Sequence, residues 1–525
     1  MEYYVSVILI AVSSALSCFV GLPAVKIIQL SGYRARGVAA WWKGSAFDVV
    51  VRYASLMLFS FIAMIVFVGC FGTFEYVRYC VPALYALLAV VFIVSAGKNG
   101  DNGAKPTGRV VRLMAVNMAL SLGLGALVAW ASYYSIYCQT LTAALALFIP
   151  FTTLAANFIT TPFEKLNNKK YVKRAQKKLA ERAPIVIGIT GSFGKTSAKN
   201  MLKAMLDKKY TVLATPGSYN TPMGVCKTVN GMLDDQQIFI AELGARYKGD
   251  VKELCDIVKP KYGIITAVGD MHIETMGSRA GVADTKFELG AALPQDGSLA
   301  LNGYNADCKA LADRETVCSK RVTGESDCVS YENLVIDGAG TSFDLVIGGK
   351  KYGVKSKLLG AHIPELACVC AATATALGIP PEDVAAAVSE MPQVEHRLQL
   401  LPSADPSVIV IDDAYNSNPV GAKNALEVLK AFDGKKIIIT PGFVELGAIE
   451  KECNRRLGGQ IAEACDYAFL VGSRAGDIKK GALAAGMNEG AISEFVSRDK
   501  AVEALRDIGG QKTVLFENDL PDNIK

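Results

Sequence analysis

The chain contains 525 residues, of which 51% are hydrophobic and 20% are charged, and its formal net charge is +5. Residues 1–163 hold 10 basic and 4 acidic side chains (about 9% charged), whereas residues 164–525 hold 45 basic and 46 acidic ones (about 25%). This distribution excludes a simple soluble enzyme, a disordered chain and a basic nucleic-acid-binding protein, because the positive excess lies among apolar stretches.

Five apolar stretches in the first part are long enough to cross about 30 Å of hydrocarbon as helices. The 51 residues at 113–163 carry no charge, which is typical of two membrane spans joined by a short loop. The sequence therefore predicts an α-helical membrane domain at residues 1–163, with about five spans. These lie at residues 5–22, 53–71, 79–96, 113–133 and 141–159.

The charges of the loops predict the orientation of these spans. Basic side chains gather in two of the loops, and basic loops favour the cytoplasmic side. We expect the N-terminus outside the cell and everything after the fifth span in the cytoplasm. The basic residues in question are Arg34, Arg36, Lys43 and Arg52 in one loop, and Lys98, Lys105, Arg109 and Arg112 in the other.

A basic segment follows the last predicted span, on a predicted linker helix at residues 164–184. It is either a solvated flank that anchors the last span or a surface for an anionic lipid or lipid-linked substrate, and these interpretations are compatible. Its basic residues are Lys165, Lys169, Lys170, Lys173, Arg174, Lys177 and Lys178.

The soluble part begins with a buried strand at residues 185–189, a glycine turn and a helix that extends to about Asp207. Such a turn lets backbone N–H groups surround phosphate oxygens, while a lysine reaches the outer phosphates and a threonine hydroxyl can bind magnesium. The expected nucleotide-binding residues are Thr190, Gly191, Ser192, Phe193, Gly194, Lys195 and Thr196.

Further motifs follow this loop in a fixed order. They are the glycine- and asparagine-containing segment at residues 214–225, the strand end at 240–245, and the segments at 269–274, 284–288, 396–399 and 412–419. Together with the phosphate loop they resemble the Mur ligase family, ATP-dependent enzymes that extend the peptide of peptidoglycan precursors and whose phosphate loop reads T-G-x-x-G-K-T. Within the family, these motifs are most similar to those of the branch that adds D-alanyl-D-alanine.

The resemblance covers about residues 185–516 and implies an α/β fold. It divides the soluble part into a phosphate-loop central domain at residues 185–392 and a Rossmann-like C-terminal domain at residues 393–525. It also implies ATP and Mg²⁺ as cofactors, and a muramyl peptide, nucleotide-linked or lipid-linked, as acceptor. The incoming amine would be an amino acid or dipeptide, D-alanyl-D-alanine above all, and the enzyme would lie at a bacterial cell membrane as a multi-pass protein.

The chemistry of amide formation gives each motif a task. ATP phosphorylates a carboxylate, and an amine then attacks the acyl phosphate; Lys195 and magnesium would neutralise the transferred phosphoryl group. A carboxylate at the end of a second strand would anchor the metal, which selects Glu242 together with Thr196. By resemblance, His272 helps to hold a second magnesium ion and Lys286 is carried as a carbamate that binds metal, although a solvated ion pair with Asp284 and Glu288 is the alternative.

The last motifs concern the C-terminal domain. By resemblance, Arg397 contacts ATP phosphates, and Asp413 at a strand end can accept a ribose hydroxyl. Asn416 and Asn418 either contribute to the site or only cap the helix that begins at Pro419. Strands are expected at residues 408–411, 437–440, 467–471 and 513–516.

Several departures from the family pattern are present. Ile363 and Leu366 stand where the family has two asparagines, the second of which meets the nucleotide. Residues 441–447 match their family motif only in part, and residues 516–519 replace a basic turn. The five predicted spans also occupy the place of the N-terminal domain that holds the uridine nucleotide in soluble members, so we expect an acceptor presented at the membrane.

The sequence leaves three alternatives to this function. A transport ATPase is suggested by residues 457–460, but no hydrophobic run ending in Asp-Glu follows them. A membrane-tethered scaffold without activity is favoured by the lost asparagines and opposed by the retained lysines, glutamate and histidine. A ligase of the same fold for another acceptor, such as a poly-γ-glutamate synthase, is the third.

Overall fold

The computed structural model describes residues 2–34, 55, 58–59, 62, 65–66, 77–98, 104–134, 141–325, 328–403, 405–414, 418–444, 446 and 449–518. The chain divides into two compact units, Met1–Lys170 and Tyr171–Lys525. The predicted domain borders near residues 163, 184 and 392 stay predictions.

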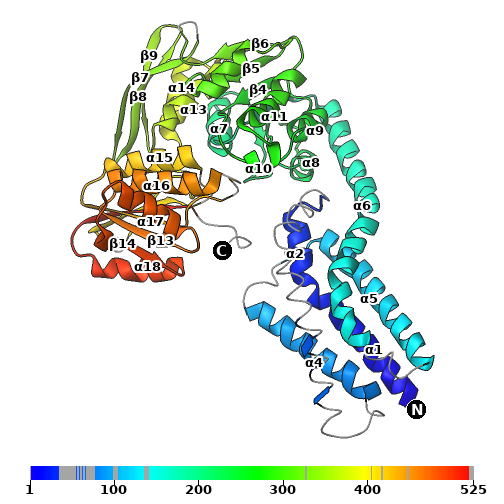
Figure 1. Ribbon diagram of the computed structural model, residues 1–525. Coiled ribbons are helices and arrows are strands. Elements are labelled where there is room, and N and C mark those ends of the chain that lie inside the picture. The colour runs from blue at the N-terminus through cyan, green and yellow to red at the C-terminus, as the bar shows by residue number, and fades with distance from the viewer. Residues whose placement is uncertain are drawn as a thin grey trace. The chain divides into compact units, whose positions relative to one another are not determined.

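The first unit is helical, and α1 packs against both α4 and α5 (Figure 1). A side chain at Gly125 of α5 would meet Ser14 Oγ of α1 at 2.0 Å, so glycine is what allows these two helices to approach so closely. Ser17 Oγ and Tyr85 Oη lie 2.8 Å apart between α1 and α4. The helices of this part are α1 (Glu2–Val20), α2 (Leu22–Leu30), α4 (Val77–Lys98), α5 (Gly108–Tyr134) and α6 (Leu141–Arg182), which continues into the second unit.

Three helices in the described part of the chain are long and apolar enough to cross a membrane: Tyr3–Leu30, Gly108–Tyr134 and Ala144–Arg182. They fall on the predicted spans at 5–22, 113–133 and 141–159. The predicted span at 79–96 falls on α4, whose apolar stretch Tyr79–Val94 is shorter. Most of the predicted span at 53–71 lies outside the described residues, so the structure supports three candidate spans rather than five.

The second unit begins with a parallel sheet in the order β2-β3-β1-β4-β5-β6. Alternate side chains of its strands enter two cores, one against α7, α13 and α14 and the other against α8, α9 and α11. Because both faces are covered, the strands are nearly continuous apolar runs. The strands are β1 (Ile185–Thr190), β2 (Val212–Ala214), β3 (Ile238–Glu242), β4 (Tyr262–Ile265), β5 (Ser298–Leu301) and β6 (Ser319–Val322).

The helices around this sheet are α7 (Lys195–Leu206), α8 (Pro222–Asn230), α9 (Asp250–Val258), α10 (Ile273–Met276), α11 (Arg279–Ala292), α12 (Ala306–Lys309), α13 (His362–Ala376) and α14 (Pro381–Glu390). An antiparallel sheet with the order β7-β8-β9 packs against α13 and α14. Its strands are β7 (Ser330–Asp337), β8 (Gly340–Ile347) and β9 (Lys350–Ser356).

A third sheet has the order β10-β11-β15-β12-β13-β14 and is parallel except for the edge strand β10. Its strands are β10 (Gln399–Leu401), β11 (Val408–Asp413), β12 (Lys435–Thr440), β13 (Tyr467–Val471), β14 (Ile492–Phe495) and β15 (Lys512–Glu517). The four strands expected from the sequence in this part are confirmed. The accompanying helices are α15 (Pro419–Lys430), α16 (Glu450–Ala464), α17 (Ala475–Ala484) and α18 (Arg498–Ala504), and residues 457–460 lie inside α16.

Asn418 is the N-cap of α15, because its side chain accepts hydrogen bonds from Val420 N at 3.1 Å and Gly421 N at 3.0 Å. Asn416 lies outside the described residues. We expect Asn418→Ala to lower the free energy of unfolding by about 1 kcal/mol, the usual contribution of such a cap. Chemical denaturation would measure the loss, and Asn418→Ser should retain most of the stability because serine keeps an acceptor. A loss of catalysis at unchanged stability would contradict a purely structural role.

Candidate active site

The predicted phosphate loop joins β1 to α7, as the sequence indicates. A side chain at Gly191 would meet Thr266 Oγ1 at 2.1 Å, and Gly194, the N-cap of α7, has φ +79°. Both positions therefore require glycine. Lys195 Nζ donates a hydrogen bond to Gly191 O at 2.7 Å, so the lysine lies across the loop. Burial, followed by the positive charge of Arg397, lowers the pKa of Lys195 to about 8, which still leaves it mostly protonated at neutral pH.

Glu242 ends β3 beside this loop, because β3 is the neighbour of β1 in the sheet. Its side chain is 1% exposed. Thr196 Oγ1 and Lys199 Nζ donate to Glu242 Oε2 at 3.1 and 2.9 Å, and Asn220 Nδ2 donates to Oε1 at 3.2 Å. Glu242 is therefore a buried carboxylate held by three hydrogen-bond donors.

Lys286 is 2% exposed in the middle of α11. Burial and the nearby charge of Lys195 lower its pKa to about 7. The two acids next to it in sequence have other partners: Asp284 Oδ1 lies 2.9 Å from Arg314 Nη2, and Glu288 accepts hydrogen bonds from Gly249 N and Lys252 N. Lys286 is therefore buried and does not form the solvated ion pair with Asp284 and Glu288 that was the alternative.

His272 begins α10 with a left-handed backbone, φ +60°. Burial and the charge of Lys286 lower its pKa to about 3, with further lowering by Arg246 and Lys195, so its imidazole is neutral. A neutral imidazole is the form that binds metal ions. His272 and Lys286 are thus brought together from different segments of the chain, as the resemblance implies.

Arg397 lies in the segment between α14 and β10. Its neighbours His396 and Leu398 have φ +56° and +47°, and such left-handed backbone in non-glycine residues concentrates at functional sites. Leu398 N donates to Asp413 Oδ1 at 3.2 Å. Burial raises the pKa of Asp413 to about 6, while the charge of Arg397 opposes this rise. The structure therefore places Arg397 near both Lys195 and Asp413.

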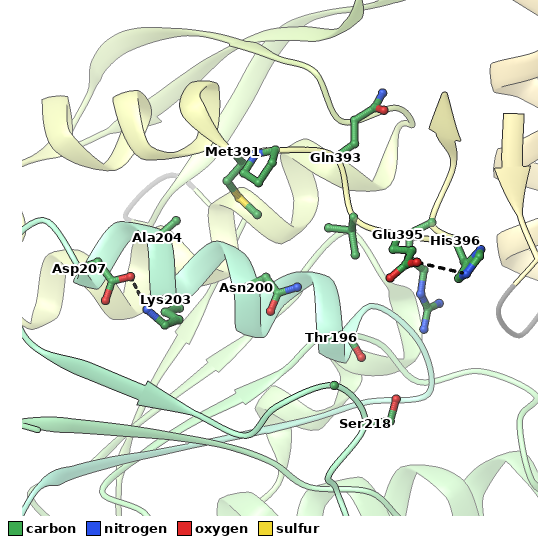
Figure 2. Close-up of a pocket in the computed structure, with 14 residues that line it drawn as sticks. Thr196, Asn200, Lys203, Ala204, Asp207, Ser218, Met391, Gln393, Glu395 and His396 are labelled. Carbon is green, nitrogen blue, oxygen red and sulfur yellow. Dashed lines mark hydrogen bonds and ion pairs between the residues drawn. The ribbon is translucent and has the colours of Figure 1, made fainter. Parts of the chain in front are cut away.

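A cavity of about 520 Å³ lies along α7, between this helix and residues 391–397 (Figure 2). Figure 2 shows Thr196, Glu395 and His396 at one end and Lys203 and Asp207 at the other. Gly217, Ser218, Arg397 and the apolar side chains of Met391 and Val394 also line this cavity. A cavity that starts at the phosphate loop and has mixed walls is suited to a nucleotide.

Two predicted departures are explained by packing. Ile363 and Leu366 are each 3% exposed and belong to the core between the central sheet and α13, and the Leu366 side chain would touch a Cβ at Gly194 at 3.1 Å. Apolar packing thus replaces the asparagines at these positions.

Glu517, in the turn that departs from the family pattern, is fully buried and accepts a hydrogen bond from Thr440 Oγ1 at 2.7 Å; burial raises its pKa to about 8. Asp519, predicted to belong to the same turn, lies outside the described residues, as do Glu445 and Gly447.

The oxygen atoms of Thr196 and Glu242 are hard donors of the kind that Mg²⁺ prefers. Among the described residues, no cluster of three or more His, Cys, Asp or Glu side chains could hold a metal ion alone. A magnesium ion at Thr196 and Glu242 would take its other ligands from nucleotide phosphates and water.

Lys199 and its bond to Glu242 were not predicted from the sequence. The signal was present, because Lys199 follows Lys195 by four positions and side chains at that spacing share one face of a helix.

Two family models match the chain: the Mur ligase middle domain at residues 189–375 and the Mur ligase glutamate ligase domain at residues 396–517. A relative from Synechocystis sp. is 30% identical over 329 residues, which is 61% of this chain and 68% of the relative. The chain therefore belongs to the Mur ligase family and is an ATP-dependent ligase of the Mur type.

The Synechocystis relative is a UDP-N-acetylmuramoyl-tripeptide--D-alanyl-D-alanine ligase. An enzyme of the same name from Bacillus subtilis is 29% identical over 332 residues, covering 63% of this chain and 71% of the relative. The MurF ligase of Thermotoga maritima, solved in complex with ADP, has the same fold, with a TM-score of 0.60, 22% identity, and coverage of 67% of this chain and 80% of that one.

Proposed function

We propose that the chain joins D-alanyl-D-alanine to the tripeptide of a muramyl-peptide precursor of peptidoglycan, with ATP as the energy source. The observation that carries this proposal is the convergence of the phosphate loop, Glu242, His272, Lys286 and Arg397 in a protein related to ligases of that name. The poly-γ-glutamate alternative and the inactive scaffold are not favoured.

The reaction has two steps in this site. A carboxylate oxygen of the acceptor attacks the γ-phosphorus of ATP, and ADP leaves; the amine then attacks the acyl carbon, loses a proton, and releases phosphate. Lys195 and Arg397 would neutralise the charge that develops on the transferred phosphoryl group. Asp413 would accept a ribose hydroxyl, and the cavity along α7 would take the rest of the nucleoside.

Magnesium, when bound, would screen the phosphate charges from the attacking carboxylate. We propose that Thr196 and Glu242 hold one ion, and that His272 and Lys286 hold a second, with Lys286 as its carbamate. The burial of Lys286 supports this, because only a neutral amine reacts with CO₂ and the pKa of this lysine is lowered to about 7.

We also propose that the apolar helices of residues 1–163 cross the membrane, with the N-terminus outside and the ligase domains in the cytoplasm. Both matched family ranges begin after residue 188. The final turns of α6 bury Ala175 and Leu179 against the central domain and expose basic side chains, among them Lys173 and Lys177. An exposed basic helix that continues an apolar one attracts anionic lipid or a lipid pyrophosphate.

A competition experiment tests the function and the form of the acceptor together. Purified full-length protein would receive ATP, D-alanyl-D-alanine and equal amounts of nucleotide-linked and lipid-linked muramyl tripeptide, and mass spectrometry would follow both products. We expect ATP-dependent addition of the dipeptide, mainly to the lipid-linked acceptor. A clear preference for the nucleotide form would refute the lipid-linked acceptor, and the absence of both products would refute the ligase reaction with this amine.

A further inference from the structure

A second lysine of α7, Lys199, has no task in the function proposed above. Its side chain is 2% exposed. Because lysine is rarely buried without a charged partner, its contacts indicate what it does. Lys199 Nζ donates to Glu242 Oε2 at 2.9 Å and to Gly217 O at 2.5 Å. Lys195, one turn earlier, donates instead to the carbonyl groups of the phosphate loop. The two lysines therefore serve different parts of the site.

Lys199 connects the proposed metal-binding carboxylate to the segment that precedes α8. Asn220 makes a second connection, since its Nδ2 donates to Glu242 Oε1 at 3.2 Å and its carbonyl oxygen accepts from Gly244 N at 2.9 Å. A side chain at Gly244 would meet Asn220 at 2.7 Å, so the backbone is packed closely here. Gly217 also lines the cavity along α7. Glu242 and one wall of the cavity are thus held in a fixed relation.

The charge of Lys199 acts on any cation that Glu242 binds. An ammonium 2.9 Å from a carboxylate oxygen holds the carboxylate in one orientation. The same ammonium repels a divalent cation at that carboxylate, and such repulsion is strong where water is excluded. The net result is a carboxylate in the correct position whose own affinity for Mg²⁺ is weakened.

We propose that Lys199 is a positioning residue that fixes Glu242 against Gly217 and keeps the affinity of the empty site for Mg²⁺ low, so that the metal binds together with nucleotide phosphates. This inference rests on the proposed use of Mg²⁺ and ATP. Phosphate oxygens supply the negative charge that Glu242, neutralised by Lys199, lacks. The amine and acceptor specificity do not enter the argument.

Three variants of the full-length protein separate the effect of the Lys199 charge from the effect of its hydrogen bonds to Glu242 and Gly217. Lys199→Gln removes the charge and keeps a hydrogen-bond donor, Lys199→Met removes both, and Lys199→Arg keeps the charge. In one experiment, binding of a fluorescent ATP analogue would be measured at increasing Mg²⁺ concentration. In the other, the melting temperature would be measured at increasing Mg²⁺ concentration without nucleotide. We expect the Mg²⁺ concentration at half-maximal effect to fall at least about 5-fold for Lys199→Gln and Lys199→Met, since a repelling charge is gone, and to stay within about 2-fold for Lys199→Arg.

The hydrogen bonds of Lys199 are tested separately by kcat. Lys199→Met cannot donate to Glu242 and should lower kcat about 10-fold below that of Lys199→Gln, which keeps a donor. An unchanged or higher Mg²⁺ requirement in Lys199→Gln would overturn the proposal. If Lys199→Met does not fold, the Gln and Arg variants still decide it. A wild-type protein that binds the analogue with Mg²⁺ but forms no product would refute the proposed reaction and not this role of Lys199.

Discussion

Replacing Lys195 with alanine should lower ATP-dependent ADP release by about 10²–10³-fold or more, the loss seen when a positioned donor to a developing charge is removed. The physical reason is that Lys195 is a half-buried, mostly protonated ammonium at the phosphate loop, where desolvation lowers its pKa to about 8. A coupled assay of ADP formation with saturating acceptor and amine would measure the effect.

Lys208→Ala is the matched control, since Lys208 lies just beyond the same helix and pairs with Glu390 at 2.7 Å on the surface. An exposed pair of this kind contributes little to stability, and we expect near wild-type ADP release. Full activity of Lys195→Ala would contradict the assignment of the phosphate loop.

Lys286→Ala should abolish product formation under ordinary conditions and regain part of it when formate or acetate is added. The variant removes the proposed carbamate, and a small carboxylate can occupy the space and supply the same two oxygen atoms to a metal ion. Product formation would be measured against carboxylate concentration. Lys252→Ala, an exposed lysine paired with Asp256, should be active and insensitive to the additives.

The wild-type protein provides a pH test of the same role. Because burial lowers the pKa of Lys286 to about 7, about half of these side chains are neutral at pH 7, whereas an ordinary lysine is almost entirely protonated. The neutral fraction falls as the pH falls below 7. At the same concentration of dissolved CO₂, reactivation after CO₂ depletion should therefore be slower at pH 6 than at pH 8. Full activity of Lys286→Ala without additives would refute the role, as would reactivation that does not depend on pH.

The sequence predicted those parts of the molecule whose signals are local. The phosphate loop requires a strand, a glycine turn and a helix in direct succession, and all three appear at the expected residues. Four of the six strands of the C-terminal sheet were predicted in the same way, because buried parallel strands are short apolar runs between turns. Apolar length likewise indicated the helices at both ends of the first unit.

The tertiary structure decided which side chains meet and which are buried. Thr196 and Glu242 are 46 positions apart and come within 3.1 Å only because β3 lies next to β1. The sequence left a solvated ion pair open as an alternative for Lys286, and packing of α11 against the sheet removed this side chain from water. Lys199 is the sharpest case: its spacing from Lys195 was visible, but its charge became a feature of the site only when the fold enclosed it with Glu242.

The sequence by itself thus determined that a weakly charged helical part precedes a ligase with a phosphate loop, because composition and contiguous motifs act over short distances along the chain. Only the tertiary structure determined the ionisation of Lys286 and His272, the packing of Ile363 and Leu366, and the partners of Lys199. Those properties depend on desolvation and on neighbouring charges, which are set by the order of the strands and not by position in the chain.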